Sequence, residues 1–150
     1  MITEWIRERR RLTEADGRGA RLAELHHIAT LTADAAAVVQ RGWAPSFWYG
    51  PAGEACLVAA IVRAAGGPSA VRSQLVRRTL DLVWHTLRRD GVAPVDYCPS
   101  PMILQVRIRD LTRWNDTPGR TSAEVVSLLA ATHAVAVAES TRLRGIPVSA

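Results

Sequence analysis

Apolar residues recur every three or four positions along most of the chain, and this spacing predicts helices. Between residues 20 and 40 they form one broad stripe, the pattern of a helix that buries a single face. Gly42 follows as a predicted C-terminal cap. Residues 69–90 repeat the pattern, with apolar positions predicted to face inward and arginines outward. The chain therefore contains two predicted long amphipathic helices.

Two further segments are predicted to contribute to the core. Residues 54–65 are nearly all apolar and predict a short central helix, closed by Gly66-Gly67-Pro68. A last helix is predicted from Ser122 to about Arg142, because Thr121 and Glu124 have the spacing of a capping box. Its predicted inward residues are Val125, Leu128, Leu129, Thr132, Ala136 and Val137.

Residues 102–109 fit two patterns. Apolar and polar residues alternate there as in a strand, yet Leu104, Ile108 and Leu111 also share one face of a helix. Ser100 before Pro101 is typical of a helix start. A strand would have no second strand to pair with, so we predict a helix.

These elements predict an all-α fold, a single compact bundle of about four to five helices over residues 20–144. The chain has 48% hydrophobic residues, mostly Ala, Val and Leu, which suit packed helices. Residues 1–19 form a predicted charged arm in which two glycines, Gly17 and Gly19, break the pattern. Residues 145–150 form a predicted tail.

The chain carries a net charge of +5, and all 19 of its positive side chains are arginines. The absence of lysine, together with abundant Ala, Val and Gly, is typical of a GC-rich genome. Nucleic-acid binding is an alternative but is not favoured, because no helix-turn-helix spacing is visible and the arginines are scattered. In that alternative the phosphate-contacting residues would be Arg72, Arg77, Arg78, Arg88 and Arg89.

The two cysteines, Cys56 and Cys98, fit neither a disulfide framework nor a zinc pattern. We therefore expect a reduced cytoplasmic setting, with no metal and no cofactor. The N-terminus lacks the apolar core of a signal peptide, and no run approaches 18 apolar residues, so we expect no membrane span.

Residues 42–53 hold an unusual concentration of aromatic side chains: Trp43, Phe47, Trp48 and Tyr49. One interpretation is that the rings cover an open end of the bundle. The other is that they form a partner-binding loop, since aromatic anchors on irregular backbone are typical of recognition surfaces.

Residues 114–125, WNDTPGRTSAEV, form the densest polar cluster in the chain. Asn115 and Asp116 are suited to turn hydrogen bonds, and Arg120 could pair with Asp116. The cluster either fixes the angle between two helices, with Trp114 in the core, or lines a pocket together with Trp43 and Cys56.

Cys56 offers an enzymatic alternative. Near a helix N-terminus the dipole would lower its pKa and favour a nucleophilic thiolate, supported by Asp116 and by His85 or His133. The other interpretation is a buried structural cysteine among apolar neighbours. His133 is expected to be a packed core residue.

Three stretches carry a family resemblance: Arg41-Gly42-Trp43, Cys56 to Ile61, and the WNDxxGRTxxEV motif. Over roughly residues 20–140 the chain resembles a family of small helical proteins of unknown function from actinobacteria and their phages. Where that family usually has a glycine in CxxGA, this chain has Ala59. The resemblance implies a helical fold and carries no activity.

These observations predict a non-catalytic helical binding or regulatory protein that engages a protein or an acidic partner, and they allow a homo-oligomer. A small cysteine-dependent enzyme and a DNA-binding protein remain alternatives. The candidate ligand- or partner-binding residues are Trp43, Trp48, Trp114, Asn115, Asp116 and Arg120.

Overall fold

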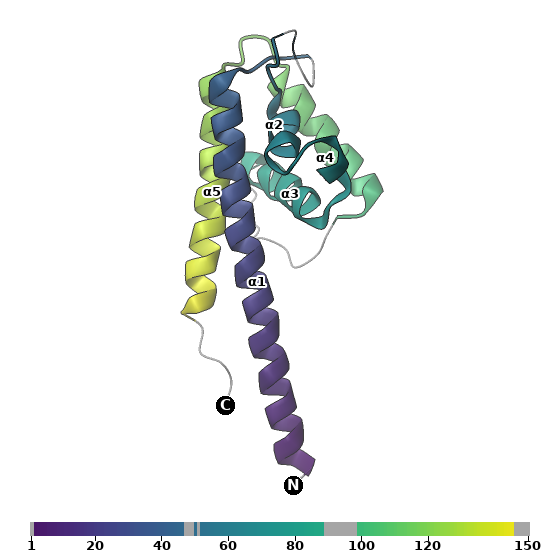
Figure 1. Cartoon of the computed structure of the whole chain (residues 1–150), viewed down its shortest axis with the longest axis vertical. Helices are drawn as coiled ribbons and strands as arrows, with labels where there is room; N and C mark the ends of the chain where they lie inside the picture. The colour runs from purple at the N-terminus through teal and green to yellow at the C-terminus, as the bar shows by residue number, and fades with distance from the viewer. Residues whose placement is uncertain (1, 47–49, 51, 89–98, 146–150) are drawn as a thin grey trace.

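The computed structural model describes residues 2–46, 50, 52–88 and 99–145, and this part of the chain is all-α, as predicted. It contains no strand, only an isolated parallel bridge between Trp43 and Ala55. Five α-helices and one 3₁₀ helix follow one another (Figure 1): α1 (Ile2–Arg41), α2 (Leu57–Ala64), η1 (Pro68–Arg72), α3 (Gln74–Arg88), α4 (Pro101–Asn115) and α5 (Ser122–Arg144).

Helices α1 and α5 lie side by side and run in opposite directions, and α2, α3 and α4 gather beside the C-terminal half of α1 (Figure 1). The short apolar helix is central, as predicted, because residues 57–62 are almost completely buried. It begins three residues later than predicted. The Ala55 N–H donates to the Gly42 carbonyl, which keeps residues 54–56 in the preceding loop.

The prediction of a single helix over residues 69–90 is wrong for the first part of this range. Residues 68–72 form η1, and Ser73 is extended, so α3 starts only at Gln74. The Ser73 hydroxyl accepts a hydrogen bond from the Val76 N–H, which satisfies one free donor of the new helix. The capping hydroxyl therefore separates the two elements.

The starts of α4 and α5 agree with the prediction. The Ser100 hydroxyl accepts from the Ile103 N–H, and residues 102–109 lie within α4, which decides for the helix over the strand. The capping box of α5 is complete, with both Thr121 and Glu124 bonded as expected. One predicted inward residue is wrong, since Val137 is 45% exposed.

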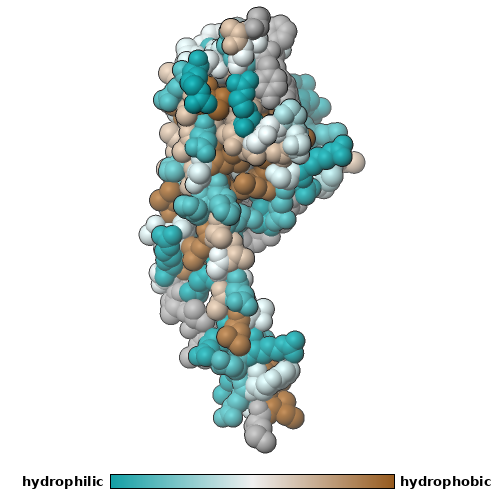
Figure 2. All heavy atoms as spheres, viewed as in Figure 1, coloured by the Kyte–Doolittle hydropathy of each residue, from teal (hydrophilic) through white to brown (hydrophobic). Residues whose placement is uncertain are grey.

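The N-terminal half of α1 projects beyond every other helix (Figures 1 and 2). The helix is continuous through Gly17 and Gly19, so the predicted break is absent. We call residues 2–19 the arm and residues 20–145 the body. No described arm residue is buried, and all except Arg18 are exposed.

Among the described residues, α5 is the one helix long and apolar enough, by length and composition, to cross a membrane. The core helix of a soluble protein meets the same criterion. One face of α5 packs along α1, and Thr132, Glu139 and Ser140 are buried on it.

Candidate functional site

Asn115, the last residue of α4, is a buried junction between three parts of the chain. Its Oδ1 accepts hydrogen bonds from the Trp43 indole Nε1 at 2.8 Å and from the Leu57 backbone N–H at 3.1 Å. Asn115 itself is 1% exposed. A single amide oxygen thus joins the end of α4, the loop after α1 and the start of α2.

Asp116 fastens the same loop from outside the junction. Its Oδ1 accepts from the Ser46 backbone N–H at 2.7 Å and from the Asn115 Nδ2 at 3.0 Å. Ser46 has φ of 68°, a left-handed conformation that costs free energy for a residue other than glycine. The carboxylate therefore helps to hold a strained turn.

The predicted pairing of Asp116 with Arg120 is wrong. The Arg120 Nε donates to the Trp114 carbonyl at 2.9 Å, and its second nitrogen pairs with Glu124 at 2.7 Å. The guanidinium lies 4.0 Å from the centre of the Trp114 ring. Arg120 thus links the end of α4 to the first turn of α5.

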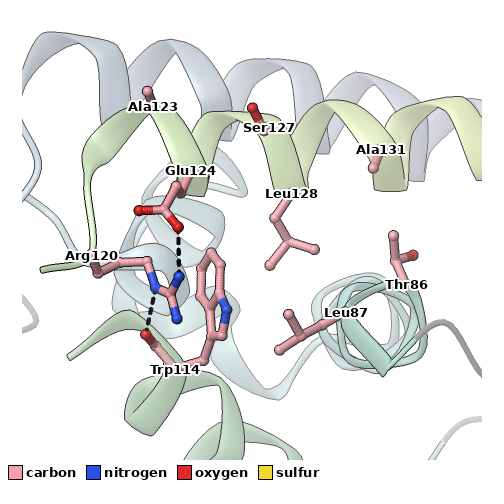
Figure 3. Close-up of a pocket in the computed structure, with 9 residues that line it drawn as sticks. All are labelled: Thr86, Leu87, Trp114, Arg120, Ala123, Glu124, Ser127, Leu128 and Ala131. Atoms are coloured by element: carbon pink, nitrogen blue, oxygen red, sulfur yellow. Dashed lines mark hydrogen bonds and ion pairs between the residues drawn. The ribbon is translucent and has the colours of Figure 1, made fainter. Parts of the chain in front are cut away.

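A groove of about 440 Å³ lies beside this link, between α3, the end of α4 and α5. Arg120 and two leucines lie on opposite sides of the Trp114 ring (Figure 3). Of the residues in the predicted shared pocket, Trp114 and Arg120 line this groove, and Trp43, Cys56 and Asp116 do not. Its lining residues are Thr86, Leu87, Trp114, Arg120, Ala123, Glu124, Ser127, Leu128 and Ala131.

Cys56 is the N-cap of α2, with its Sγ accepting from the Ala59 N–H at 3.4 Å. The side chain is 4% exposed and lines none of the described surface cavities. Burial raises the pKa of the Cys56 thiol, against the smaller lowering effect of its hydrogen bonds to backbone N–H groups. The expected depression of this pKa is therefore wrong, and the geometry is that of a neutral structural thiol.

The two candidate supporting histidines are engaged elsewhere. The His133 Nδ1 lies 2.7 Å from the Ala29 carbonyl oxygen, so the half-buried ring bonds α5 to α1, in line with the expected packing role. The His85 Nε2 lies 3.4 Å from an Asp81 oxygen within α3.

A polar cluster between α3 and α4 has no counterpart among the predicted site residues. Asp81 is 2% exposed and accepts from the Arg107 Nε at 3.2 Å. The Arg107 guanidinium lies 3.4 Å from the Trp84 ring centre, and the Trp84 indole donates to Asp110 at 3.0 Å. Periodicity places Asp81 on the polar side of the predicted helix, beside Arg77 and Arg88, so the sequence pattern gives no signal of its burial.

Three arginines of α3 that were candidates for phosphate contacts do not form one unpaired, exposed basic face. Arg78 pairs with Glu24, and Arg88 pairs with Asp110. Arg77 is half-buried, Arg72 is exposed, and Arg89 lies outside the described residues. The aromatic residues 47–49, including Trp48, also lie outside the described residues, as does Cys98.

No group of three or more metal-binding side chains occurs among the residues that the structure describes. A further feature suited to binding is the arm. It exposes four large apolar side chains: Ile2 at 76%, Trp5 at 61%, Ile6 at 51% and Leu12 at 55%.

The chain belongs to a family of unknown function, DUF6197, whose family model matches residues 24–135. Comparisons with curated proteins and with solved structures found no match. The match covers most of the body, including the Asn115 junction, and leaves the arm outside it. Family membership accordingly supports the fold and carries no chemistry.

Proposed function

We propose that this chain is a non-catalytic helical binding protein that engages another polypeptide through its arm. The observation that carries the proposal is the exposure of Ile2, Trp5, Ile6 and Leu12 in the part of α1 that projects beyond every other described helix. A helix of about 18 residues is marginal in water without packing. Apolar anchors at helical spacing are a recurring means of recognition between helices.

The chemistry of the body supports a binding role over catalysis. The buried Cys56 thiol has a raised pKa, and Asp116 is committed to the loop after α1. The proposal includes a cytoplasmic protein, and the arginine-only basic composition together with the WNDxxGRTxxEV motif supports an actinobacterial or phage source.

The arm is a mixed surface, which favours a polypeptide partner over a nucleic acid. Residues 2–19 contain five arginines and four acidic residues, so the arm has little net charge. A phosphate backbone would meet almost as much repulsion as attraction there. A helix or groove with both charge signs at its rim fits better.

Photo-crosslinking in cells tests the proposal. A photoreactive residue replaces Trp5 or Leu12, and matched controls carry it at Thr3 or Gly17, which are exposed but lie on other sides of the helix. We expect polypeptide adducts from positions 5 and 12 and far fewer from positions 3 and 17. Equal adduct yields at all four positions, or none, would overturn the proposal.

A further inference from the structure

From the arm sequence and its projection, we infer that the polypeptide bound by the arm is a second copy of this chain, with two arms paired in antiparallel orientation. This inference rests on the proposed binding role of the arm. It names the partner and the geometry of the contact.

The first observation is the position of the apolar residues. Trp5, Leu12 and Gly19 are separated by seven residues each, so they lie along one side of α1, with Ile2 beside them. The line through Trp5, Leu12 and Gly19 lies on the other side of the helix circumference from Leu25 and Ile28, whereas Ile6 continues the stripe that the body buries. The arm face is therefore separate from the body core and free to meet another helix.

The second observation is the charge order along the arm. Residues 7–11 hold four arginines and one glutamate, a net charge of +3, whereas residues 13–17 hold Glu14 and Asp16, a net charge of −2. Leu12 lies midway between the two segments. An antiparallel pair centred on Leu12 brings each +3 segment against the −2 segment of the other copy. A parallel pair would bring +3 against +3.

The third observation is the pair of glycines. Nothing lies within 4 Å of a Cβ built at Gly17 or Gly19, so no described part of the chain requires them. Glycine in a helix interior is unfavourable relative to alanine. In the antiparallel pair, Trp5 of one copy lies level with Gly19 of the other, since both are seven residues from Leu12. The missing Cβ there leaves room for the indole.

The projection of the arm makes the pairing geometrically open. The arm extends beyond the end of α5 and beyond α2, α3 and α4 (Figure 1). Antiparallel arms place the two bodies at opposite ends of the contact, so the bodies do not collide. The arm is about 27 Å long. Two helices in contact over that length bury less surface than a standard interface, which buries roughly 800 Å² per partner. We therefore expect a reversible dimer with a dissociation constant in the micromolar range.

Sedimentation equilibrium of the full chain tests the self-association. We expect a monomer–dimer equilibrium that the double variant Trp5→Gln, Leu12→Gln weakens at least tenfold. The matched variant Thr3→Gln, Gly17→Gln, at positions on other sides of the helix, should leave the dissociation constant unchanged. Thermal unfolding of each variant at low concentration verifies that the body is intact.

Charge exchange tests the orientation. Arg9→Glu with Arg10→Glu should weaken an antiparallel dimer, because it opposes acidic to acidic segments, but would strengthen a parallel one. Glu14→Arg with Asp16→Arg should also weaken self-association, and a mixture of the two variants should restore a heterodimer. In a Cys98→Ser background, a mixture of Glu8→Cys and Asp16→Cys chains should form a disulfide between them, with little Glu8→Cys homodimer.

A full chain that stays monomeric up to about 200 µM, well above the expected micromolar range, would overturn this inference. If photo-crosslinks from position 5 then reach a different protein, the proposed binding role stands and only the identity of the partner is wrong. If neither self-association nor any crosslink is found, both proposals are wrong.

Discussion

The two halves of α1 belong to one continuous helix but are stabilised in different ways. In the body half, Leu25, Ile28, Ala35 and Val39 are buried against other helices. In the arm half no residue is buried, and the visible support is local, such as the Arg11–Glu8 ion pair at 2.7 Å between half-exposed side chains. An exposed pair of this kind contributes little. Helix continuity is therefore no sign of equal stability along α1.

The largest difference in the free energy of unfolding should be between alanine variants of two leucines in α1. Leu25→Ala removes a fully buried side chain and should lower the free energy of unfolding by about 4 kcal/mol, within the range of leucine-to-alanine changes in cores. Leu12→Ala should change it by less than about 0.5 kcal/mol in the monomer. Urea denaturation at low protein concentration measures both. Similar losses for the two variants would mean that the arm packs on the body.

Substitution at the Asn115 junction should lower the free energy of unfolding nearly as much as substitution in the apolar core. Asn115→Ala leaves the Trp43 indole N–H and the Leu57 N–H without their acceptor, which should cost about 3 kcal/mol. The neighbouring control Thr117→Ala removes an exposed hydroxyl and should cost under about 0.5 kcal/mol. A loss for Asn115→Ala no greater than for the control would show that Asn115 is not a structural junction.

The rate of thiol modification should differ between a cysteine in the body and a cysteine in the arm. In a Cys98→Ser background, Cys56 should react with a disulfide reagent on the order of a hundredfold more slowly than a cysteine introduced by Leu12→Cys, because burial hides the thiol and raises its pKa. Comparable rates would contradict the buried position of Cys56.

The same raised pKa gives a pH dependence with a defined sign. The unfolded chain releases the Cys56 proton first, so the contribution of this thiol to stability is intact below the ordinary thiol pKa of roughly 8.5 and is lost as the pH rises through the folded pKa. Cys56→Ser should flatten the alkaline fall in stability, as measured by urea denaturation between about pH 7 and pH 10.

The smallest effect should come from the arm glycines. Gly17→Ala replaces a poor helix former on a side away from Trp5 and Leu12, and should slow hydrogen exchange of the arm amides about fivefold, or roughly 1 kcal/mol. It should leave the unfolding of the body unchanged. Gly19→Ala should give the same slowing in the monomer but weaken self-association. Equal association for both variants would contradict the role given to Gly19.

Periodicity and local capping signals were sufficient to predict the helical fold. The hydroxyls of Ser100 and Thr121 act on N–H groups three residues away, so the sequence alone places the starts of α4 and α5. The break at Ser73 carried a similar signal and was missed. The predicted interruption at Gly17 and Gly19 is wrong because a helical glycine costs only about 1 kcal/mol, too little to interrupt a helix that is anchored by a packed body.

The site was harder to predict because its contacts are not local. The partners of Asn115 are 72 and 58 residues away along the chain, and Asp116 bonds Ser46, 70 residues away. Arg120 had Asp116 and Glu124 both within four residues, and spacing alone did not decide between them. Trp43, Leu57 and Asn115 come from the three stretches that carry the resemblance, and hydrogen bonds to one amide oxygen bring them together.

The Asn115 junction also bears on the order of folding. Its hydrogen bonds close long loops, so they can form only after α1, α2 and α4 have come together. We therefore expect these bonds to be largely absent from the folding transition state, and Asn115 variants to accelerate unfolding while leaving the folding rate almost unchanged. The hydrogen bonds of the junction would then determine how slowly the native state unfolds.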